Sequence, residues 1–86
     1  MKTRIALYGA LRDADPSGHV DLDIPAGCDI AGLRQLLIRH LRQHAPGIGA
    51  ELVERSAFAS AEEILHDARS VPEGVELAVL PPVSGG

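Results

Sequence analysis

The sequence predicts an α+β domain in which one helix packs on one face of a single mixed sheet. Three stretches, residues 4–8, 19–24 and 75–80, carry their larger apolar residues at every second position, which is the period of half-buried strands. Between residues 30 and 44 the apolar residues recur at helical spacing. A helix of this length provides a crossover, so the first and last strands can pair in parallel at the middle of the sheet.

The first two strands are predicted to form a hairpin. In the first strand Ile5 and Leu7 lie on one side and Tyr8 on the other. The turn signal Asp15-Pro16-Ser17-Gly18 follows, and residues 19–24 then alternate between apolar residues and aspartates. Neighbouring strands of this kind usually pair with each other.

The helix is predicted to begin after Asp29, a favourable N-cap, and to end at His44 before Pro46-Gly47. Its apolar stripe should face the sheet. The predicted core contains Ile5, Leu7, Val20, Leu22, Ile30, Leu33, Leu37, Leu41, Leu77 and Val79. The opposite face is expected to be solvated, with phosphate binding as the alternative; it carries Arg34, Gln35, Arg39, Arg42 and Gln43.

The segment between Gly49 and Gly74 carries weaker signals. Residues 51–53 are compatible with a short helical turn, and residues 55–60 with a strand that holds Phe58. The pattern Ser60-Ala61-Glu62-Glu63 is a capping box, which on local grounds predicts a helix through residue 69. The final strand follows the turn at residues 72–74.

Composition limits the possible functions. The chain has 86 residues with 45% hydrophobic residues but only 2% aromatic ones, so aliphatic side chains must fill a small core and a deep ligand pocket is not expected. The single cysteine, Cys28, excludes an internal disulfide and a Cys-based zinc site. Neither a membrane span nor a signal peptide is apparent, and a cytoplasmic location is expected.

Charge is distributed unevenly along the chain. Residues 1–50 carry six basic and five acidic groups, whereas residues 51–86 carry two basic and seven acidic groups. An acidic docking face implies a basic partner surface and argues against nucleic acid; ordinary solubilising charge is the alternative.

Internal catalytic motifs are not recognisable, since the chain has no nucleophile elbow and no glycine-rich phosphate loop. His40 and His44 have the spacing of a metal pair, but helix-end solvation explains them better, and no metal site is predicted. Cys28 lies near a helix N-terminus, which can activate a thiol, but a filler role is favoured. His19 and His66 are interpreted as surface residues.

The ending Pro81-Pro82-Val83-Ser84-Gly85-Gly86 is the most informative segment. Two terminal glycines occur by chance in about one chain in two hundred. The prolines favour an extended chain, and glycine has no Cβ to obstruct a narrow tunnel. A terminal carboxylate is ionised at neutral pH and is a poor electrophile, so an ATP-using enzyme would have to activate it. We therefore expect a domain over residues 1–80 and a flexible tail over residues 81–86.

Residues 74–86, with this ending, resemble the terminus of the MoaD/ThiS family of ubiquitin-like sulfur carriers, and within it the small subunit of molybdopterin synthase. Residues 5–12 are similar to that family's first strand and turn, and residues 30–37 to its helix start. The resemblance covers nearly the whole chain and implies a ubiquitin-like β-grasp fold. It also implies a short strand near Ile64, where the capping box predicts a helix, and we favour the strand.

By that resemblance Gly86, preceded by Gly85, would be adenylated by a ubiquitin-activating-type adenylyltransferase and converted to a thiocarboxylate with a sulfur donor protein. It would then donate sulfur to cyclic pyranopterin monophosphate inside the large synthase subunit. ATP would be used by the activating partner, and the chain itself would bind no cofactor, membrane or nucleic acid and have no active site of its own. The matching interface residues are Tyr8, Ile64 and Leu80, with Pro81, Pro82, Val83 and Ser84 as the tail. The alternatives are sulfur transfer for thiamine or cysteine biosynthesis and a ubiquitin-like protein modifier.

Overall fold

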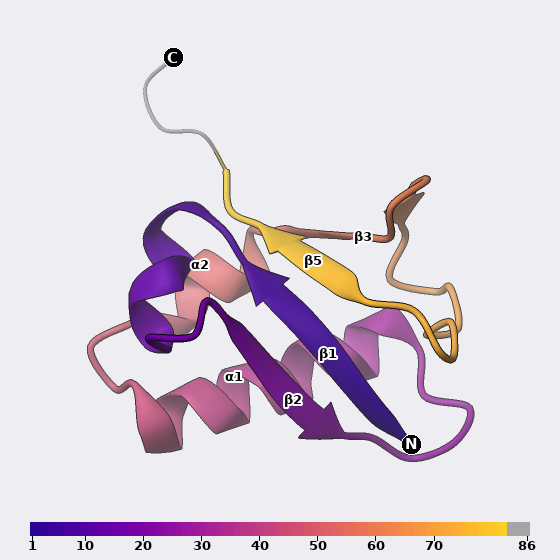
Figure 1. Cartoon of the computed structure of the whole chain (residues 1–86), viewed down its shortest axis with the longest axis horizontal. Helices are drawn as coiled ribbons and strands as arrows, with labels where there is room; N and C mark the ends of the chain where they lie inside the picture. Colours follow the sequence, from indigo (N-terminus) through magenta and orange to yellow (C-terminus); the bar gives the residue numbers. More distant parts are fainter. Residues whose placement is uncertain (83–86) are drawn as a thin grey trace.

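The computed structural model describes residues 1–82, which form one five-stranded mixed sheet with a long helix on one face (Figure 1). The helices are the 3-10 helix η1 (Gly9–Ala14), α1 (Ile30–His44) and α2 (Ala50–Glu54). The strands are β1 (Lys2–Leu7), β2 (His19–Asp23), β3 (Ala57–Ala59), β4 (Ile64–Leu65) and β5 (Leu77–Leu80). The predicted α+β architecture is confirmed.

The strands lie in the order β2-β1-β5-β3-β4. The β1–β2 hairpin is antiparallel, as predicted. At the centre of the sheet β1 and β5 run parallel, with Ile5 opposite Leu77 and Leu7 opposite Val79. The remaining pairs, β3 with β5 and β3 with β4, are antiparallel. The first and last strands therefore meet at the centre of the sheet and end side by side, which fixes where the tail departs (Figure 1).

Helix α1 has the predicted bounds because its first turn is capped as the sequence suggests. The Asp29 carboxylate accepts a hydrogen bond from the Gly32 N–H at 2.8 Å. The N–H groups of Ile30 and Ala31 donate to the carbonyls of Arg69 and Asp67, at 2.9 and 3.0 Å. The start of the helix is thus joined to the loop between β4 and β5.

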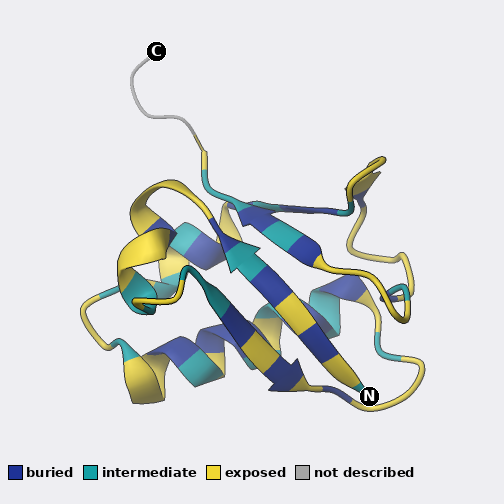
Figure 2. Cartoon of the chain, in the orientation of Figure 1, coloured by how far each residue is buried: buried dark blue, intermediate teal, exposed yellow. Residues whose placement is uncertain are grey.

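The core lies between α1 and the inner face of the sheet, and every predicted core residue is buried there. Figure 2 shows the alternation of buried and exposed residues along β1 and β2 that the sequence period predicts. The core also contains Ile24 and Phe58, as the sequence indicates, and five residues that were not predicted to belong to it: Leu11, Ile38, Val53, Leu65 and Val71. Burial of these side chains joins the segments after β1 and before β5 to the same core.

Arg34 departs from its predicted position on the solvated face of α1. Its side chain is only 11% exposed. The guanidinium donates to the carbonyls of Val53 at 2.8 Å and Ser56 at 2.6 Å, and to the Asp67 carboxylate at 2.8 Å. It also lies 5.0 Å from the centre of the Phe58 ring. Helical spacing cannot reveal this role, because the partners come from segments about twenty to thirty residues later in the chain.

The capping-box helix predicted after Ser60 does not form. The Ser60 hydroxyl accepts from the Glu62 N–H at 3.3 Å, and the Ser60 N–H donates to the Glu63 carbonyl at 2.9 Å, so the segment turns. Strand β4 follows, with Leu65 buried opposite Phe58. The strand expected near Ile64 from the resemblance is confirmed, because burial of Leu65 outweighs the local helix signal.

Several strand ends also differ from prediction: β1 begins at Lys2 rather than Arg4, and β2 ends at Asp23 rather than Ile24. Strand β1 ends at Leu7 rather than Tyr8, because Gly9 has a φ of +57° that an extended strand cannot accommodate, and η1 begins there. Strand β5 begins at Leu77 rather than Val75, and Val75 is 44% exposed.

Candidate functional site

The outer face of the sheet, opposite α1, carries a row of small side chains across its centre. Ala6 on β1 lies opposite Ala78 on β5, which lies opposite Ala59 on β3. The row ends at His19 on β2, opposite Ala6, and at Ile64 on β4, opposite Ala59. We call Ala6, Ala78 and Ala59 the alanine row. Because methyl groups stand where larger side chains would project, this part of the face is hollowed.

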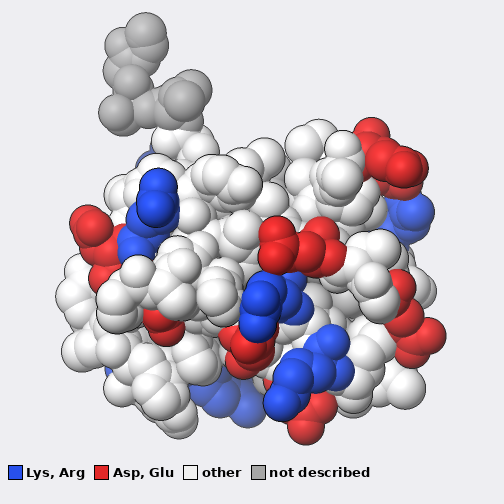
Figure 3. All heavy atoms as spheres, viewed as in Figure 1, with Lys and Arg blue, Asp and Glu red and all other residues white. Residues whose placement is uncertain are grey.

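The alanine row is the floor of a surface groove of about 640 Å³. Its rim includes two exposed apolar residues, Tyr8 and Val75, and the acidic residues Glu62, Glu63 and Glu76. Figure 3 shows acidic and basic groups next to one another near the centre of this side of the molecule, and a largely uncharged area above them, toward the end of β5. The arrangement suits an apolar partner surface that carries basic groups around its edge.

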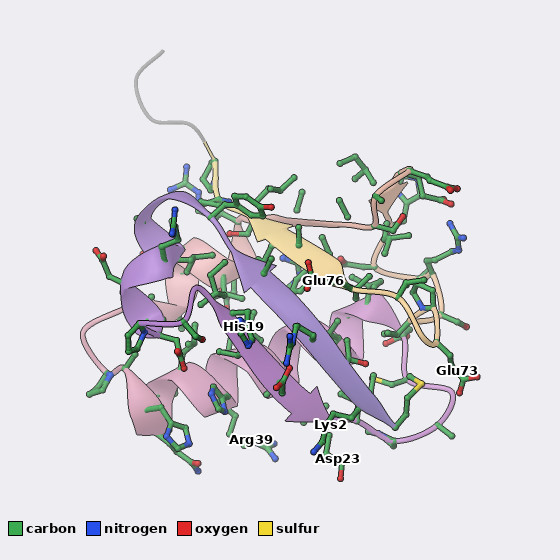
Figure 4. The ribbon with its side chains drawn as sticks, in the orientation of Figure 1. Lys2, His19, Asp23, Arg39, Glu73 and Glu76 are labelled. Atoms are coloured by element: carbon green, nitrogen blue, oxygen red, sulfur yellow. The ribbon has the colours of Figure 1, made fainter. Side chains whose placement is uncertain are left out.

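The acidic rim is only partly neutralised from within the domain. Glu63 forms a two-pronged ion pair with Arg69, and the hydrogen bond from the guanidinium lowers the pKa of the Glu63 carboxyl. None of the salt bridges within residues 1–82 involves Glu62 or Glu76. Glu76 lies beside the start of β5 (Figure 4). Negative charge on this rim is therefore available to a basic partner.

The residues predicted to contact a partner lie at two places around the groove. Tyr8 is 50% exposed and Leu80 is half-buried, and both line a second hollow of about 580 Å³ at the base of the tail. Ile64, 55% exposed, lies at the other end of the alanine row. The structure thus brings Tyr8 and Leu80 together and leaves Ile64 across the groove from them.

The base of the tail continues directly from β5. Pro81 is half-buried, Pro82 is exposed, and both line the second hollow with Tyr8 and Leu80. The other predicted tail residues, Val83, Ser84, Gly85 and Gly86, lie outside the described residues.

Cys28 is placed as a packing residue. Its thiol donates to the Asp29 carbonyl at 3.3 Å, and burial, followed by the nearby Asp29 charge, raises the pKa of the thiol. A raised pKa keeps the sulfur protonated, so the alternative of a reactive thiol at the helix start gains no support.

His40 and His44 stack on the flank of α1, with ring centres 4.3 Å apart. Within residues 1–82 there is no group of three or more histidine, cysteine or acidic side chains arranged to hold a metal ion. No helix in that part of the chain is long and apolar enough to cross a membrane.

Sequence reasoning missed the alanine row. The alternation along β1 does place Ala6 on the same side as Tyr8, and the alternation along β5 could have placed Ala78 on that face in the same way. Their neighbour Ala59 could not be placed so, because the register of β3 depends on pairing with a distant strand.

The chain matches the model of a protein family described as ThiS family, over residues 5–86. Among curated proteins it is similar to the molybdopterin synthase sulfur carrier subunit of Synechococcus elongatus. The two are 35% identical over 92 aligned positions, which cover all of both chains.

Solved structures share the fold. SAMP1 from Haloferax volcanii matches all of this chain and all of its own with a TM-score of 0.72 and 24% identity. A putative molybdopterin converting factor subunit 1 from Pyrococcus furiosus matches with a TM-score of 0.65 and 15% identity, and the match covers 96% of this chain and 99% of that one. A structure described as a complex of subunits 1 and 2 of the molybdopterin-converting factor from Helicobacter pylori matches with a TM-score of 0.56 and 17% identity, over all of both chains. The ubiquitin-like β-grasp prediction is confirmed.

Proposed function

Because the chain belongs to the ThiS family of ubiquitin-like sulfur carriers, we propose that it is the sulfur-carrier small subunit of a molybdopterin synthase. The observation that carries the proposal is the 35% identity to the sulfur carrier subunit from Synechococcus elongatus, over all of both chains. The ending Pro81-Pro82-Val83-Ser84-Gly85-Gly86, which directly follows β5, supports it.

The proposed chemistry takes place at the carboxylate of Gly86. The carboxylate attacks the α-phosphate of ATP on a ubiquitin-activating-type adenylyltransferase, which releases pyrophosphate and forms an acyl-adenylate. A sulfur donor protein then supplies a sulfur nucleophile that displaces AMP and leaves a thiocarboxylate. Two such carriers would convert cyclic pyranopterin monophosphate to a dithiolene, each returning to the carboxylate form. The chain contributes the acyl group, and its partners contribute the active sites.

The outer sheet face is the proposed docking surface for the large synthase subunit. Its groove offers an apolar floor of small side chains, and Tyr8, Leu80 and Ile64 flank it with half-buried or exposed apolar groups. The acidic residues Glu62 and Glu76 on the rim favour a partner surface with basic groups. Because Leu80 directly precedes Pro81, a partner seated on this face would lie beside the start of the tail.

Intact-mass spectrometry tests the proposal. The full chain is incubated with ATP, the adenylyltransferase and a sulfur source, and the expected product gains the mass difference between one sulfur and one oxygen at Gly86. The matched control lacks Gly86, keeps the same folded domain and should gain nothing. An unchanged mass for the full chain, with an adenylyltransferase that activates another carrier in the same assay, would refute the proposal.

A protein modifier would use the same terminal glycine but a different acceptor. It would form an isopeptide bond between Gly86 and a lysine of a target protein. Recovery of such conjugates from native cells, together with failure of the thiocarboxylate to transfer sulfur to the pterin, would replace the carrier proposal with this alternative. Sulfur transfer to a thiazole or cysteine precursor instead of the pterin would redirect it to another carrier pathway.

A further inference from the structure

Gly9 lies where the parallel pair β1 and β5 ends. Leu7 is opposite Val79 in the register, so two residues further along each chain Gly9 comes beside Pro81. Gly9 has a φ of +57°, in the left-handed region, and the chain turns there into η1. The turn is held by the Leu11 N–H, which donates to the Tyr8 carbonyl at 3.1 Å.

The missing side chain of Gly9 makes room for the Pro81 ring. A Cβ built on Gly9 would lie 2.9 Å from Pro81 Cγ and 3.8 Å from Pro81 Cδ. The first of these distances is shorter than real Cβ contacts allow. Of the other glycines with positive φ, Gly27 at +81° and Gly74 at +73° would place a Cβ with no atom within 4 Å, and Gly18 at +80° would place one 3.9 Å from Arg12 Nε, an ordinary contact. Gly9 therefore combines a backbone requirement with a contact to the start of the tail.

The Pro81 ring cannot move aside independently of the backbone. Its atoms close onto the backbone nitrogen, so φ of Pro81 is held near −65° and the ring cannot rotate away as a flexible side chain would. A group that pushes on Cγ therefore moves the backbone of Pro81 and, with it, Pro82. The φ of Pro82 is fixed in the same way, and Pro82 also restricts the backbone of Pro81, so a shift at Pro81 is not easily corrected at the next residue.

We infer that Gly9 is a positioning residue for the tail: it seats the Pro81 ring and so sets the direction in which the chain leaves β5. This inference rests on the proposed function, because the direction matters only if residue 86 must reach a reaction centre on a partner. A displacement of about 1 Å at a reacting group can slow a reaction by about a hundredfold. Gly9 does not touch the reacting atoms and acts through Pro81.

ATP–pyrophosphate exchange by the adenylyltransferase provides the test, with the carrier as the varied substrate. Gly9→Ala is expected to lower kcat by about tenfold to a hundredfold and to leave KM within about twofold, because Tyr8, Leu80 and the groove over the alanine row keep their side chains while the tail is misdirected. Gly27→Ala is the matched control, since it places alanine at a similar positive φ without a contact. It should leave both constants near those of the original chain.

Pro81→Ala supplies the second arm. Alanine has no Cγ or Cδ, so the added Cβ at residue 9 no longer meets a ring. Introducing Gly9→Ala into the Pro81→Ala chain should therefore reduce kcat much less than it does in the original chain. An equal reduction in both backgrounds, or equal kcat values for Gly9→Ala and Gly27→Ala, would overturn the inference.

A structural readout separates this inference from the proposed function. Nuclear Overhauser contacts between the Pro81 ring and residue 9 should change in Gly9→Ala while those within the β1–β2 hairpin stay the same; unchanged ring contacts would overturn the inference.

If Gly9→Ala does not fold, Gly9→Asn replaces it, because asparagine tolerates positive φ but carries the same Cβ. If the original chain supports no exchange, the proposed function fails, and the Overhauser contacts still decide whether Gly9 positions Pro81.

Discussion

The two faces of the sheet are built from alternate residues of the same strands, and they differ most in side-chain size. On the inner face of β1 and β5 stand Ile5, Leu7, Leu77 and Val79, all buried against α1. On the outer face the residues between them include the alanine row. The inner face is covered by buried side chains that pack together, whereas the outer face leaves a groove of about 640 Å³. The comparison indicates that one face stabilises the domain and the other is available to a partner.

The largest effect is expected from emptying the inner face. Phe58→Ala removes a fully buried ring and should lower the free energy of unfolding by about 3–5 kcal/mol, because a cavity remains. Total stability of a domain is about 5–15 kcal/mol, so much of it would be lost. Urea unfolding provides the measurement. Ile64→Ala, in the neighbouring strand but on the outer face, is the control and should cost about 0.5 kcal/mol. Equal losses would contradict the division between faces.

A smaller loss is expected from Arg34, a polar residue beside the inner layer. Arg34→Met keeps an apolar stem near Phe58 but removes the hydrogen bonds to the Val53 and Ser56 carbonyls, which should cost about 2–3 kcal/mol in urea unfolding. Asp67→Asn removes only the ion pair. Because Asp67 is 60% exposed, that change should cost at most about 1 kcal/mol. A greater loss for Asp67→Asn than for Arg34→Met would show that the ion pair is the main contribution.

A larger side chain on the outer face should weaken binding to the large synthase subunit and leave the free energy of unfolding nearly unchanged. Ala78→Leu places a larger side chain on the floor of the groove and should weaken binding to the large synthase subunit about tenfold, which is about 1.4 kcal/mol, as measured by calorimetry. Its unfolding midpoint should change little. Ala26→Leu adds the same volume at an exposed turn away from the groove and should leave the affinity unchanged. Unchanged binding by Ala78→Leu would exclude the groove as the docking site.

The smallest effect is expected at the flank of the inner layer, where His40 lies partly buried. Burial lowers the pKa of His40, and the nearby His44 lowers it further, while Asp15 opposes them. Protonation therefore favours the unfolded chain, so stability is greatest above a pH of about 6.5 and falls as the pH drops below it. Thermal unfolding at about pH 7.5 and about pH 5.5 should show this decline. His40→Gln should reduce its slope, and an unchanged slope would contradict the assignment to His40.

The sequence by itself determined the hairpin, the bounds of α1 and its buried stripe. These depend on periodicity and on a cap within a few residues, both of which are local properties. It also indicated the family, because the tail residues and the first strand carry the resemblance. The proposed site residues Gly85 and Gly86 come from this source alone.

Tertiary structure decided the features that require residues from distant segments. The capping box at Ser60 gave way to a turn and a strand because Leu65 is buried opposite Phe58. Arg34 is largely removed from solvent because α2 and the residue before β3 bring carbonyl acceptors to it. The alanine row and the contact between Gly9 and Pro81 both depend on the register of β5, which links strands about seventy residues apart. Local propensity does not encode such a register; the burial of one face of each strand selects it.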